Sequence, residues 1–268
     1  MLSLDILHKN MNNDLVSIIM PSYNCGQYVE QTIRSVQAQT YQNWEIIFVD
    51  DCSTDDSVAK VMAMKEKDNR ISIYHNARNS GAAVSRNAAF RYAKGRWIAF
   101  LDSDDLWEPT KLERQVHFME VNGYKFSYTC YKEMDADGND TDVVVYGPKK
   151  ITKTGMFAFC WPGCLTVMYD ASAVGLIQIE DIKKNNDYAM WLKVCQKADC
   201  YLLPEVLAKY RRGRSGSVSS HSISTMIKWH YKLFRDAEKM GVITSLWHTG
   251  INLVCGFYKK RKYIKKTK

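Results

Sequence analysis

Several features that would place this chain in a common class of protein are missing from its sequence. No segment holds the roughly 18 consecutive apolar residues that a membrane-spanning helix needs. The first residues also lack a signal-peptide pattern, because Asp5, Asn10, Asn12, Asn13 and Asp14 interrupt the apolar run. We therefore expect neither a membrane span nor a secretory leader.

The cysteines do not follow a metal-binding or disulfide pattern. None of the eight stands in a Cys-x-x-Cys pair, and several lie within apolar runs. This arrangement argues against a zinc site, and buried thiols are typical of proteins from a reducing cytosol. Cys160 and Cys164 form the closest pair, which we expect to pack in the core.

Glycine-rich phosphate motifs are missing too. The first apolar run, 16–20, is followed by Pro-Ser-Tyr-Asn, which is neither a dinucleotide fingerprint nor a Gly-Lys-Ser/Thr loop. This argues against NAD-dependent enzymes and P-loop NTPases. If the chain binds a nucleotide, it does so through other groups.

The first part of the chain alternates short apolar runs with segments of helical spacing. The predicted strands are 16–20, 45–49, 71–74 and 97–101. Such alternation predicts a parallel α/β sheet with right-handed crossovers. A polar loop follows each strand, at 21–24, 50–56, 76–81 and 102–105. These loops should gather at the edge of the sheet where α/β proteins bind ligands.

The last of these loops carries three carboxylates. Asp102 and Asp104, two residues apart, can direct oxygen ligands at one hard cation, Mn²⁺ or Mg²⁺, which would bring a diphosphate with it. Glu108-Pro109-Thr110 then predicts the opening of a helix. Because Asp and Ser are common in turns and at N-caps, turn chemistry is the alternative explanation.

Positive charge is concentrated at the end of the chain. The net charge is +8, but the last ten residues hold seven basic and no acidic side chains, which leaves +1 for the rest. Such a segment suits an anionic surface, and we expect lipid rather than nucleic acid because no nucleic-acid recognition motif accompanies it. Trp247, Ile251, Val254 and Tyr258 recur before it at helical spacing, which fits either an interfacial membrane helix or a helix packed on the domain.

Four motifs in a fixed order resemble those of the family 2 glycosyltransferases, which have the GT-A fold. They are Ser-Ile-Ile-Met-Pro-Ser-Tyr-Asn (17–24), Val-Asp-Asp-Cys-Ser-Thr-Asp (49–55), Asn-Ser-Gly-Ala-Ala-Val-Ser-Arg-Asn (79–87) and Leu-Asp-Ser-Asp-Asp (101–105). The resemblance covers about 16–215, and the combination is specific although each motif alone is weak. Cys52 stands where the family usually has glycine.

The resemblance implies an α/β fold of the GT-A, Rossmann-like type, with a mostly parallel central sheet, flanking helices and further C-terminal helices. We expect an N-terminal extension at 1–15 and a catalytic domain at 16–218. Within that domain, 16–107 would be the nucleotide-binding half and 108–218 the acceptor half. The C-terminal helices and the basic tail would occupy 219–268.

The resemblance also implies a set of site residues. The nucleotide-binding set is Pro21, Tyr23, Asn24, Asp50, Asp51, Arg86, Asp102 and Ser103. Tyr23 would stack on uracil, as aromatic rings do on bases, and Asp51 would accept a hydrogen bond from the uracil edge with support from Asp50. The metal ligands would be Asp102, Asp104 and Asp105. Arg86 would contact diphosphate or sugar, although a solvated helix arginine is the alternative.

A second acidic motif lies in the acceptor half. The family usually has Glu-Asp-x-x-x-Trp there, with the Asp as general base; here Asn186 replaces the Glu and Asp187 remains. Capping of the helix is the alternative role for Asp187. A Gly- and Ser-rich segment follows at 210–219. Its Arg211 and Arg214 are candidates for a lid over the diphosphate, or are simply solvated.

These expectations together describe a metal-dependent, inverting glycosyltransferase. It would move a hexose, glucose or galactose, from a UDP-sugar to GlcNAc or GalNAc on undecaprenyl diphosphate in O-antigen or capsule synthesis. It would act in the cytoplasm, at the inner face of the membrane. Two alternatives remain: a sugar nucleotidyltransferase, which needs no base on the acceptor side, and a non-enzymatic membrane or polyanion binder that acts through its basic tail.

Overall fold

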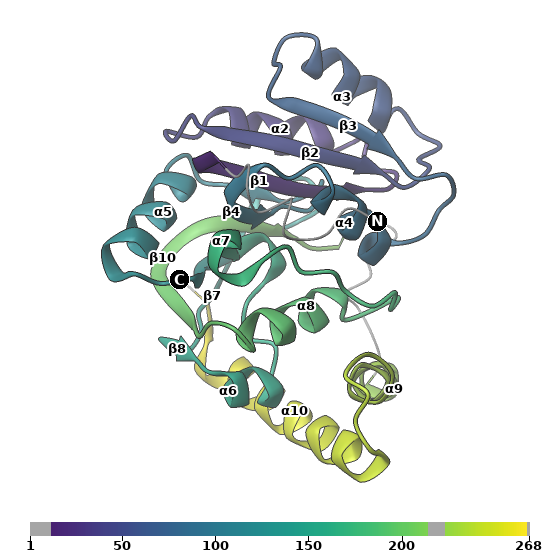
Figure 1. The fold of residues 1–268 in the computed structure, drawn as a ribbon, viewed down its shortest axis with the longest axis vertical. Helices are drawn as coiled ribbons and strands as arrows, with labels where there is room; N and C mark the ends of the chain where they lie inside the picture. The colour runs from purple at the N-terminus through teal and green to yellow at the C-terminus, as the bar shows by residue number, and fades with distance from the viewer. Residues whose placement is uncertain (1–11, 214–222, 267–268) are drawn as a thin grey trace.

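The computed structural model of the chain describes residues 12–213 and 223–266, in which one eleven-stranded sheet is flanked by helices (Figure 1). The main path of the sheet runs in the order β11 (Ile264–Lys266), β7 (Asp140–Val145), β6 (Phe126–Met134), β9 (Met168–Asp170), β4 (Gly95–Phe100), β1 (Asn12–Ser22), β2 (Trp44–Asp50) and β3 (Ile71–His75). A long strand, β10 (Cys200–Arg211), pairs with β6 and also with the short strands β5 (Leu106–Trp107) and β8 (Lys150–Ile151).

The two halves of the sheet differ in strand direction. The strands β3, β2, β1 and β4 are all parallel, as the alternating sequence pattern predicts. Beyond β4 most pairs are antiparallel, including β4–β9, β6–β9 and β6–β7, whereas β10 runs parallel to β6. The predicted α/β fold is therefore confirmed, and the sheet is mixed: the strands of the nucleotide-binding half are parallel, whereas the acceptor half combines antiparallel pairs with the parallel β6–β10 pair. Hairpin connections such as the one between β6 and β7 produce the antiparallel part.

Helices cover both faces of the sheet, and two apolar cores result. One face carries α2 (Val29–Gln37), α3 (Ser57–Lys65) and α5 (Lys111–Asn122). The other carries α4 (Ala82–Phe90), α6 (Lys153–Ala158), α7 (Ala171–Val174) and α8 (Asn186–Cys195). In β1, Ile18 and Met20 belong to the first core and Ile19 to the second, which is the alternation expected of a strand buried on both sides.

Some element boundaries differ from the predictions. β1 begins at Asn12, inside the predicted extension 1–15, because Asn12 pairs with Gly95 of β4. α5 begins at Lys111 after the N-cap Thr110, slightly later than predicted. A short 3-10 turn, η1 (Cys164–Thr166), precedes β9. Within the range predicted for the C-terminal helices, α9 (Ile223–Lys232) is continued by a π-helical turn, η2 (Leu233–Ala237).

The basic residues at the end of the chain lie in a helix and a strand, whereas a basic tail after the last helix was expected. α10 (Val242–Lys262) lies at the end of the molecule opposite α3 (Figure 1) and already contains four of the basic residues. The chain then returns to the sheet, where β11 pairs with the edge strand β7. Lys259 donates from Nζ to the carbonyl of Trp161 at 2.8 Å. No helix within 12–213 or 223–266 combines the length and apolar content required to cross a membrane.

Candidate active site

An open cleft of roughly 890 Å³ lies at the carboxyl ends of β1, β2 and β4, where the polar loops were expected to meet. Most of the predicted site residues line it: Pro21, Tyr23, Asn24, Asp51, Arg86, Asp102, Ser103, Asp104 and Asp187. Asp50, Asp105 and Arg211 are buried behind the lining, and Arg214 lies outside the described residues. The structure thus brings the nucleotide, acidic and base motifs of the sequence to one cleft.

The floor of the nucleotide side is built around the carboxylate of Asp51. This buried side chain accepts hydrogen bonds from Asn76 Nδ2 at 2.7 Å, Ser80 N at 2.9 Å and Gly81 N at 2.6 Å. Because an ionised carboxylate offers about four acceptor positions, the three protein donors leave room for one more partner in the cleft. Tyr23 stands beside it with 47% of its surface exposed, so its ring is available for stacking.

The loop after β2 requires an unusual backbone conformation. Cys52 has φ of 62°, in the left-handed region that favours glycine, which gives a physical reason for glycine at this position. Its Sγ donates to the carbonyl of Asn76 at 3.3 Å. The neighbouring Asp50 accepts from the backbone N–H of Ser53 at 3.2 Å and shapes the turn. The substitution by cysteine is therefore accommodated without loss of the loop.

The acidic loop places its carboxylates in two directions. Asp102 and Asp104 line the cleft, whereas Asp105 points inward and accepts from the backbone N–H of Arg211 at 2.8 Å. Burial and the nearby Asp104 and Asp102 raise the pKa of Asp105 well above its usual value. Crowding of like charges in a cleft is a setting that a divalent cation relieves.

The donors present fit a hard divalent cation. Asp102 and Asp104 could supply oxygen ligands, and within 12–213 and 223–266 no cluster of three or more His, Cys, Asp or Glu side chains forms a complete cage. Mg²⁺ in enzymes is commonly held by one or two carboxylates together with substrate phosphates. Two carboxylates at the mouth of a nucleotide cleft match that pattern. Asp105 is better placed to support the loop than to bind the ion.

Asp187 faces the cleft from the start of α8. It is the second residue of that helix, and the N-cap position belongs to Asn185, so Asp187 is not the capping residue. Its Oδ1 accepts from the N–H of Tyr188 at 2.8 Å. Burial raises the pKa of Asp187 above its ordinary value, while the positive charge of Arg86 acts in the opposite sense. A carboxylate with a raised pKa beside a ligand cleft has the properties of a general base.

Comparison with known proteins agrees with this geometry. Residues 17–161 match the sequence model of glycosyl transferase family 2. The chain belongs to this family. It is similar to WfaP of Escherichia coli, a UDP-Glc:α-D-GlcNAc-diphosphoundecaprenol β-1,3-glucosyltransferase, with 40% identity over 80% of this chain and 84% of WfaP. The protein is therefore a glycosyltransferase, and the nucleotidyltransferase and non-enzymatic alternatives are set aside.

Solved structures of two glycosyltransferases share the fold. Residues 1–349 of TarS of S. aureus, solved with UDP-GlcNAc, have a TM-score of 0.66 at 19% identity, over 92% of this chain and 76% of that TarS chain. The mannosyltransferase PcManGT of Pyrobaculum calidifontis, solved with GDP-Man and Mn²⁺, has a TM-score of 0.63 at 14% identity. The match covers 95% of this chain and 81% of the PcManGT chain. At these identities the likeness concerns the fold, and it confirms the GT-A architecture.

Arg86 connects the two sides of the glycosyltransferase cleft. It is a buried residue of α4, so the alternative of a solvated helix arginine is wrong. Nη2 donates to Asp102 Oδ1 at 2.5 Å, and Nη1 donates to the side-chain carbonyl of Asn186. Asn186, which stands where the family usually has Glu, therefore serves as a neutral acceptor for this arginine, next to Asp187.

Arg211 is a buried residue of the sheet and not part of a mobile lid over the cleft. It ends β10, is buried, and donates from Nε to the carbonyl of Asp104 at 2.8 Å. Nη2 donates to Gln31 Oε1 at 2.8 Å, and the guanidinium lies over the ring of Tyr28. These contacts hold the acidic loop from behind. The expectation that Arg211 reaches the diphosphate gives way to a supporting role, because β10 extends further than the Gly- and Ser-rich composition suggests.

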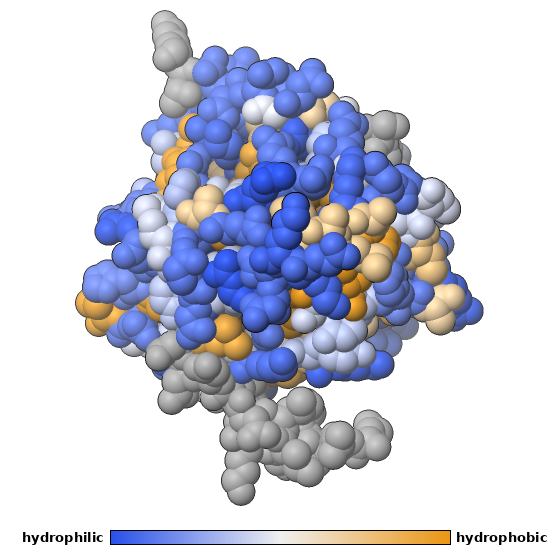
Figure 2. Space-filling model, turned by 90° about the horizontal axis from the view of Figure 1, so that it is seen from above, coloured by the Kyte–Doolittle hydropathy of each residue, from blue (hydrophilic) through white to orange (hydrophobic). Residues whose placement is uncertain are grey.

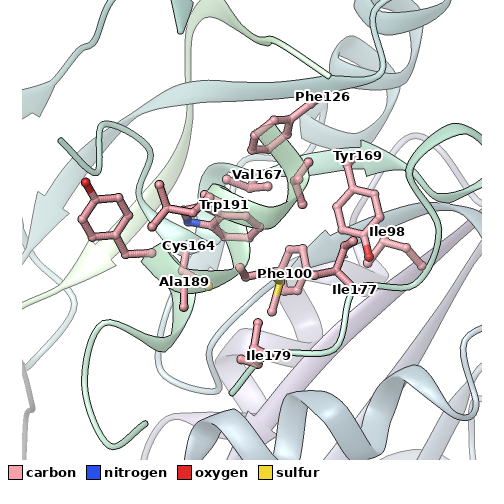
Figure 3. Close-up of a cluster of buried hydrophobic side chains, with 14 of the residues drawn as sticks. Ile98, Phe100, Phe126, Cys164, Val167, Tyr169, Ile177, Ile179, Ala189 and Trp191 are labelled. Carbon is pink, nitrogen blue, oxygen red and sulfur yellow. The ribbon is translucent and has the colours of Figure 1, made fainter. Parts of the chain in front are cut away.

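An aromatic core fixes α8 against the acidic loop. Trp191 of α8 packs edge-on against Phe100 with ring centroids 4.9 Å apart, and it also contacts Phe126 (Figure 3). Phe100 ends β4, two residues before Asp102. Since Trp191 and Asp187 lie one turn apart on α8, this packing sets the position of the base relative to the acidic loop.

Sequence reasoning missed one wall of the cleft. Met226, Trp229 and His230 of α9 line it on the same side as Asp187. Burial lowers the pKa of His230, whose ring contacts that of Tyr188. His230 Nδ1 has no hydrogen-bond partner among the described residues. The aromatic run Trp229-His230-Tyr231 was the available signal, but no motif connected it to the cleft.

Proposed function

We propose that the enzyme transfers a hexose from a UDP-sugar to the sugar of a lipid-linked acceptor, GlcNAc or GalNAc on undecaprenyl diphosphate, in O-antigen or capsule synthesis. Glucose is the first donor sugar to test and galactose the second. The observation that carries the proposal is that Asp187 faces the same cleft as Asp51 and the acidic loop. The name of WfaP supports UDP-glucose and a GlcNAc-diphosphoundecaprenol acceptor, and TarS was solved with a UDP-sugar.

On the donor side, the nucleotide-binding half holds the uracil ring and the ribose of the UDP-sugar. Tyr23 stacks on uracil, and Asp51 uses its remaining acceptor position for the uracil N–H. Pro21 and Asn24 complete the pocket, and Asp102 with Ser103 lies by the ribose. Asp102 and Asp104 would hold Mn²⁺ or Mg²⁺, which would supply positive charge to stabilise the departing diphosphate. The Mn²⁺ in the PcManGT structure supports this choice of ion.

On the acceptor side, Asp187 acts as general base. Its carboxylate takes the proton of the acceptor hydroxyl while that oxygen forms a bond to the anomeric carbon and the bond to UDP breaks. Attack from the face opposite the leaving group inverts the configuration, so an α-linked UDP-sugar gives a β-glycoside. A single base on one face and a diphosphate on the other fit one direct displacement.

We place the enzyme in the cytoplasm, at the inner face of the membrane. An undecaprenyl-linked acceptor is held in a bilayer, so the cleft must come to the membrane surface. The basic residues at the end of the chain favour an anionic surface. The acceptor and the location are one proposal, since each implies the other.

The first test is binding, followed by turnover. We expect calorimetry to show Mn²⁺-dependent binding of UDP and weaker binding of GDP, dTDP and CDP. Incubation with UDP-glucose and a GlcNAc-diphosphate lipid should then release UDP and give a β-glucoside, identified from its anomeric coupling constant. An α-linked product would overturn the inverting mechanism. If no UDP-hexose supports transfer while another sugar nucleotide does, the donor proposal is wrong.

A further inference from the structure

α10 is amphipathic, but it turns its apolar side outward. Ile243 is 84% exposed, Trp247 67% and Phe257 74%, and these positions lie on one face of the helix. Three further apolar residues are also exposed: Leu246, Val254 and Tyr258. A surface helix normally buries this stripe against the core. The outward apolar stripe is therefore the feature that requires an explanation.

The side of α10 that packs on the protein is polar. Ser245, Thr249 and Asn252 are buried, and Asn252 Nδ2 donates to the hydroxyl of Tyr188 on α8 at 2.7 Å. The hydroxyls of Ser245 and Thr249 donate hydrogen bonds to the backbone carbonyls one turn earlier in α10, those of Gly241 and Ser245. The two hydroxyls are thus paired within the helix, and the bond from Asn252 to Tyr188 fixes the rotation of the helix against α8. The outward direction of the apolar side is thus determined by specific contacts.

α9, which packs against α10, also exposes apolar residues. Ile223 is exposed there, and Met226 and Ile227 are partly so. Met226 also lines the active-site cleft, so the surface reaches the wall of the cleft. We call the exposed apolar residues of α9 and α10 the outer face. By contrast, the opposite end of the molecule, which carries α3, presents mostly hydrophilic side chains (Figure 2).

Charge identifies the partner that suits the outer face. From Gly241 to the end, the sequence contains no Asp or Glu, and Lys260, Arg261 and Lys262 are exposed in the last turn of α10. The same stretch of a second copy of the chain would bring no carboxylate to pair with these cations. An anionic lipid bilayer would instead accept both the apolar side chains and the flanking cations.

We propose that the outer face of α9 and α10 is an interfacial membrane-binding surface for anionic lipid. α10 would lie in the plane of the bilayer with Trp247 and Phe257 among the acyl chains and the basic turn among the headgroups. This orientation brings the α9 wall of the cleft to the membrane surface. The inference extends the proposed function, since a polyprenyl-linked acceptor would then reach Asp187 without leaving the bilayer.

Vesicle binding tests the outer face directly. The full chain should sediment with vesicles of phosphatidylglycerol and phosphatidylethanolamine and much less with phosphatidylcholine alone. We expect Trp247→Glu with Phe257→Glu to weaken binding by about tenfold or more, because each charge must enter the acyl region. Val121→Glu, at an exposed apolar position of α5, is the matched control and should bind as the unchanged protein does.

The charge and the partner are tested separately. Lys260→Gln with Arg261→Gln should weaken binding to anionic vesicles and reduce its dependence on salt. Equal vesicle binding by the unchanged protein and the Trp247→Glu, Phe257→Glu variant would overturn the proposal. A second result would also overturn it: the unchanged protein forms a dimer by light scattering and does not bind vesicles, while the Trp247→Glu, Phe257→Glu variant is a monomer.

A water-soluble acceptor separates this proposal from the proposed function. Transfer to a short-chain GlcNAc diphosphate should be unchanged in the Trp247→Glu, Phe257→Glu variant, because neither residue lines the cleft. If the unchanged protein transfers sugar to the soluble acceptor but ignores vesicles, the membrane proposal alone fails. If it binds vesicles but transfers nothing, only the proposed function fails.

Discussion

Arg86 Nη2 lies 2.5 Å from Asp102 Oδ1, and Nη1 of the same guanidinium donates to Asn186, so one buried cation joins the acidic loop to the start of α8. The contact spans the two halves of the glycosyltransferase. It also brings a fixed positive charge close to Asp187, where that charge lowers the pKa of the base against the effect of burial. The protonation of Asp187 and the geometry of the acidic loop therefore depend on one residue.

Replacing Arg86 by Gln should move the acid limb of the profile of kcat/KM against pH to a higher pH. Asp187 must be ionised to act as a base, so activity falls as the pH decreases through its pKa. Removal of the Arg86 charge raises that pKa, and the fall should begin at a higher pH. The measurement is kcat/KM against pH, with Arg86→Lys as the charge-conserving control. An unchanged acid limb in Arg86→Gln would mean that Asp187 does not control the profile.

Asp187→Asn should nearly abolish transfer while the protein still binds UDP. Loss of a general base costs about 10²–10⁴-fold in rate, and Asp187 lies on the acceptor side of the cleft. Single-turnover kinetics and calorimetry of UDP give the two readouts. Retained sugar transfer by the variant would remove Asp187 from the mechanism.

The same substitution should stabilise the folded protein at neutral pH. The pKa of Asp187 is raised in the folded state, so its contribution to stability is present at low pH and is lost as the pH rises through that pKa. Asn carries no charge to desolvate and should not show this loss. Urea unfolding of both proteins at acidic and neutral pH tests this. A lower urea midpoint for the variant at neutral pH would contradict it.

Metal binding should be visible without turnover. We expect Mn²⁺ with UDP to raise the thermal unfolding temperature, because the ion neutralises the crowded carboxylates of the acidic loop. EDTA should reverse the shift, and Asp104→Ala should prevent it. Glu66→Ala, at an exposed carboxylate after α3, is the control and should keep the full shift. An undiminished shift in Asp104→Ala would exclude that carboxylate as a ligand.

Trp229 and His230 should affect the acceptor and not the donor. Both line the cleft beside Asp187, on the side away from the nucleotide loops. Trp229→Ala and His230→Ala are each expected to raise the acceptor KM severalfold, with UDP affinity unchanged. Lys228→Ala, an exposed neighbour on α9, should change neither constant. A weaker affinity for UDP in either cleft variant would assign the α9 wall to the donor.

Cys52→Gly should stabilise the fold. Relief of the left-handed backbone at φ 62° exceeds the entropic cost of glycine in the unfolded chain, and we expect a gain of about 0.5–1 kcal/mol. Urea unfolding measures this. Cys52→Ala, which keeps a β-carbon, is the control and should give no gain. If the two variants are equally stable, the backbone at this position is not strained.

Local motifs allowed much of the fold and site to be predicted. The strands of the nucleotide-binding half are short apolar runs, and the residues that line the cleft follow them directly, so Asp51, Asp102 and Asp104 could be placed from the sequence. Asp187 could be placed only by family resemblance, because an acidic residue early in a helix has several roles. Local patterns do not reveal which distant segment supports a loop, and Arg211 was accordingly misassigned.

The C-terminal helix shows another limit of sequence reasoning. Periodicity identified the apolar positions of α10, but it does not state which side of a helix faces the protein. Asn252 lies outside that periodic pattern, yet it is a buried contact to α8. The rotation of α10 depends on partners in α6 and α8, which the helix's own sequence does not contain.

The bond between Asp105 and Arg211 also has a consequence for the order of events during synthesis. The two residues are separated by 106 positions, so the acidic loop leaves the ribosome long before the residue that holds it. The parallel strands of the nucleotide-binding half can pair in the nascent chain while this loop still lacks its support. Catalytic competence should then arise only when β10 has joined β6, so the first appearance of activity would report completion of the acceptor half.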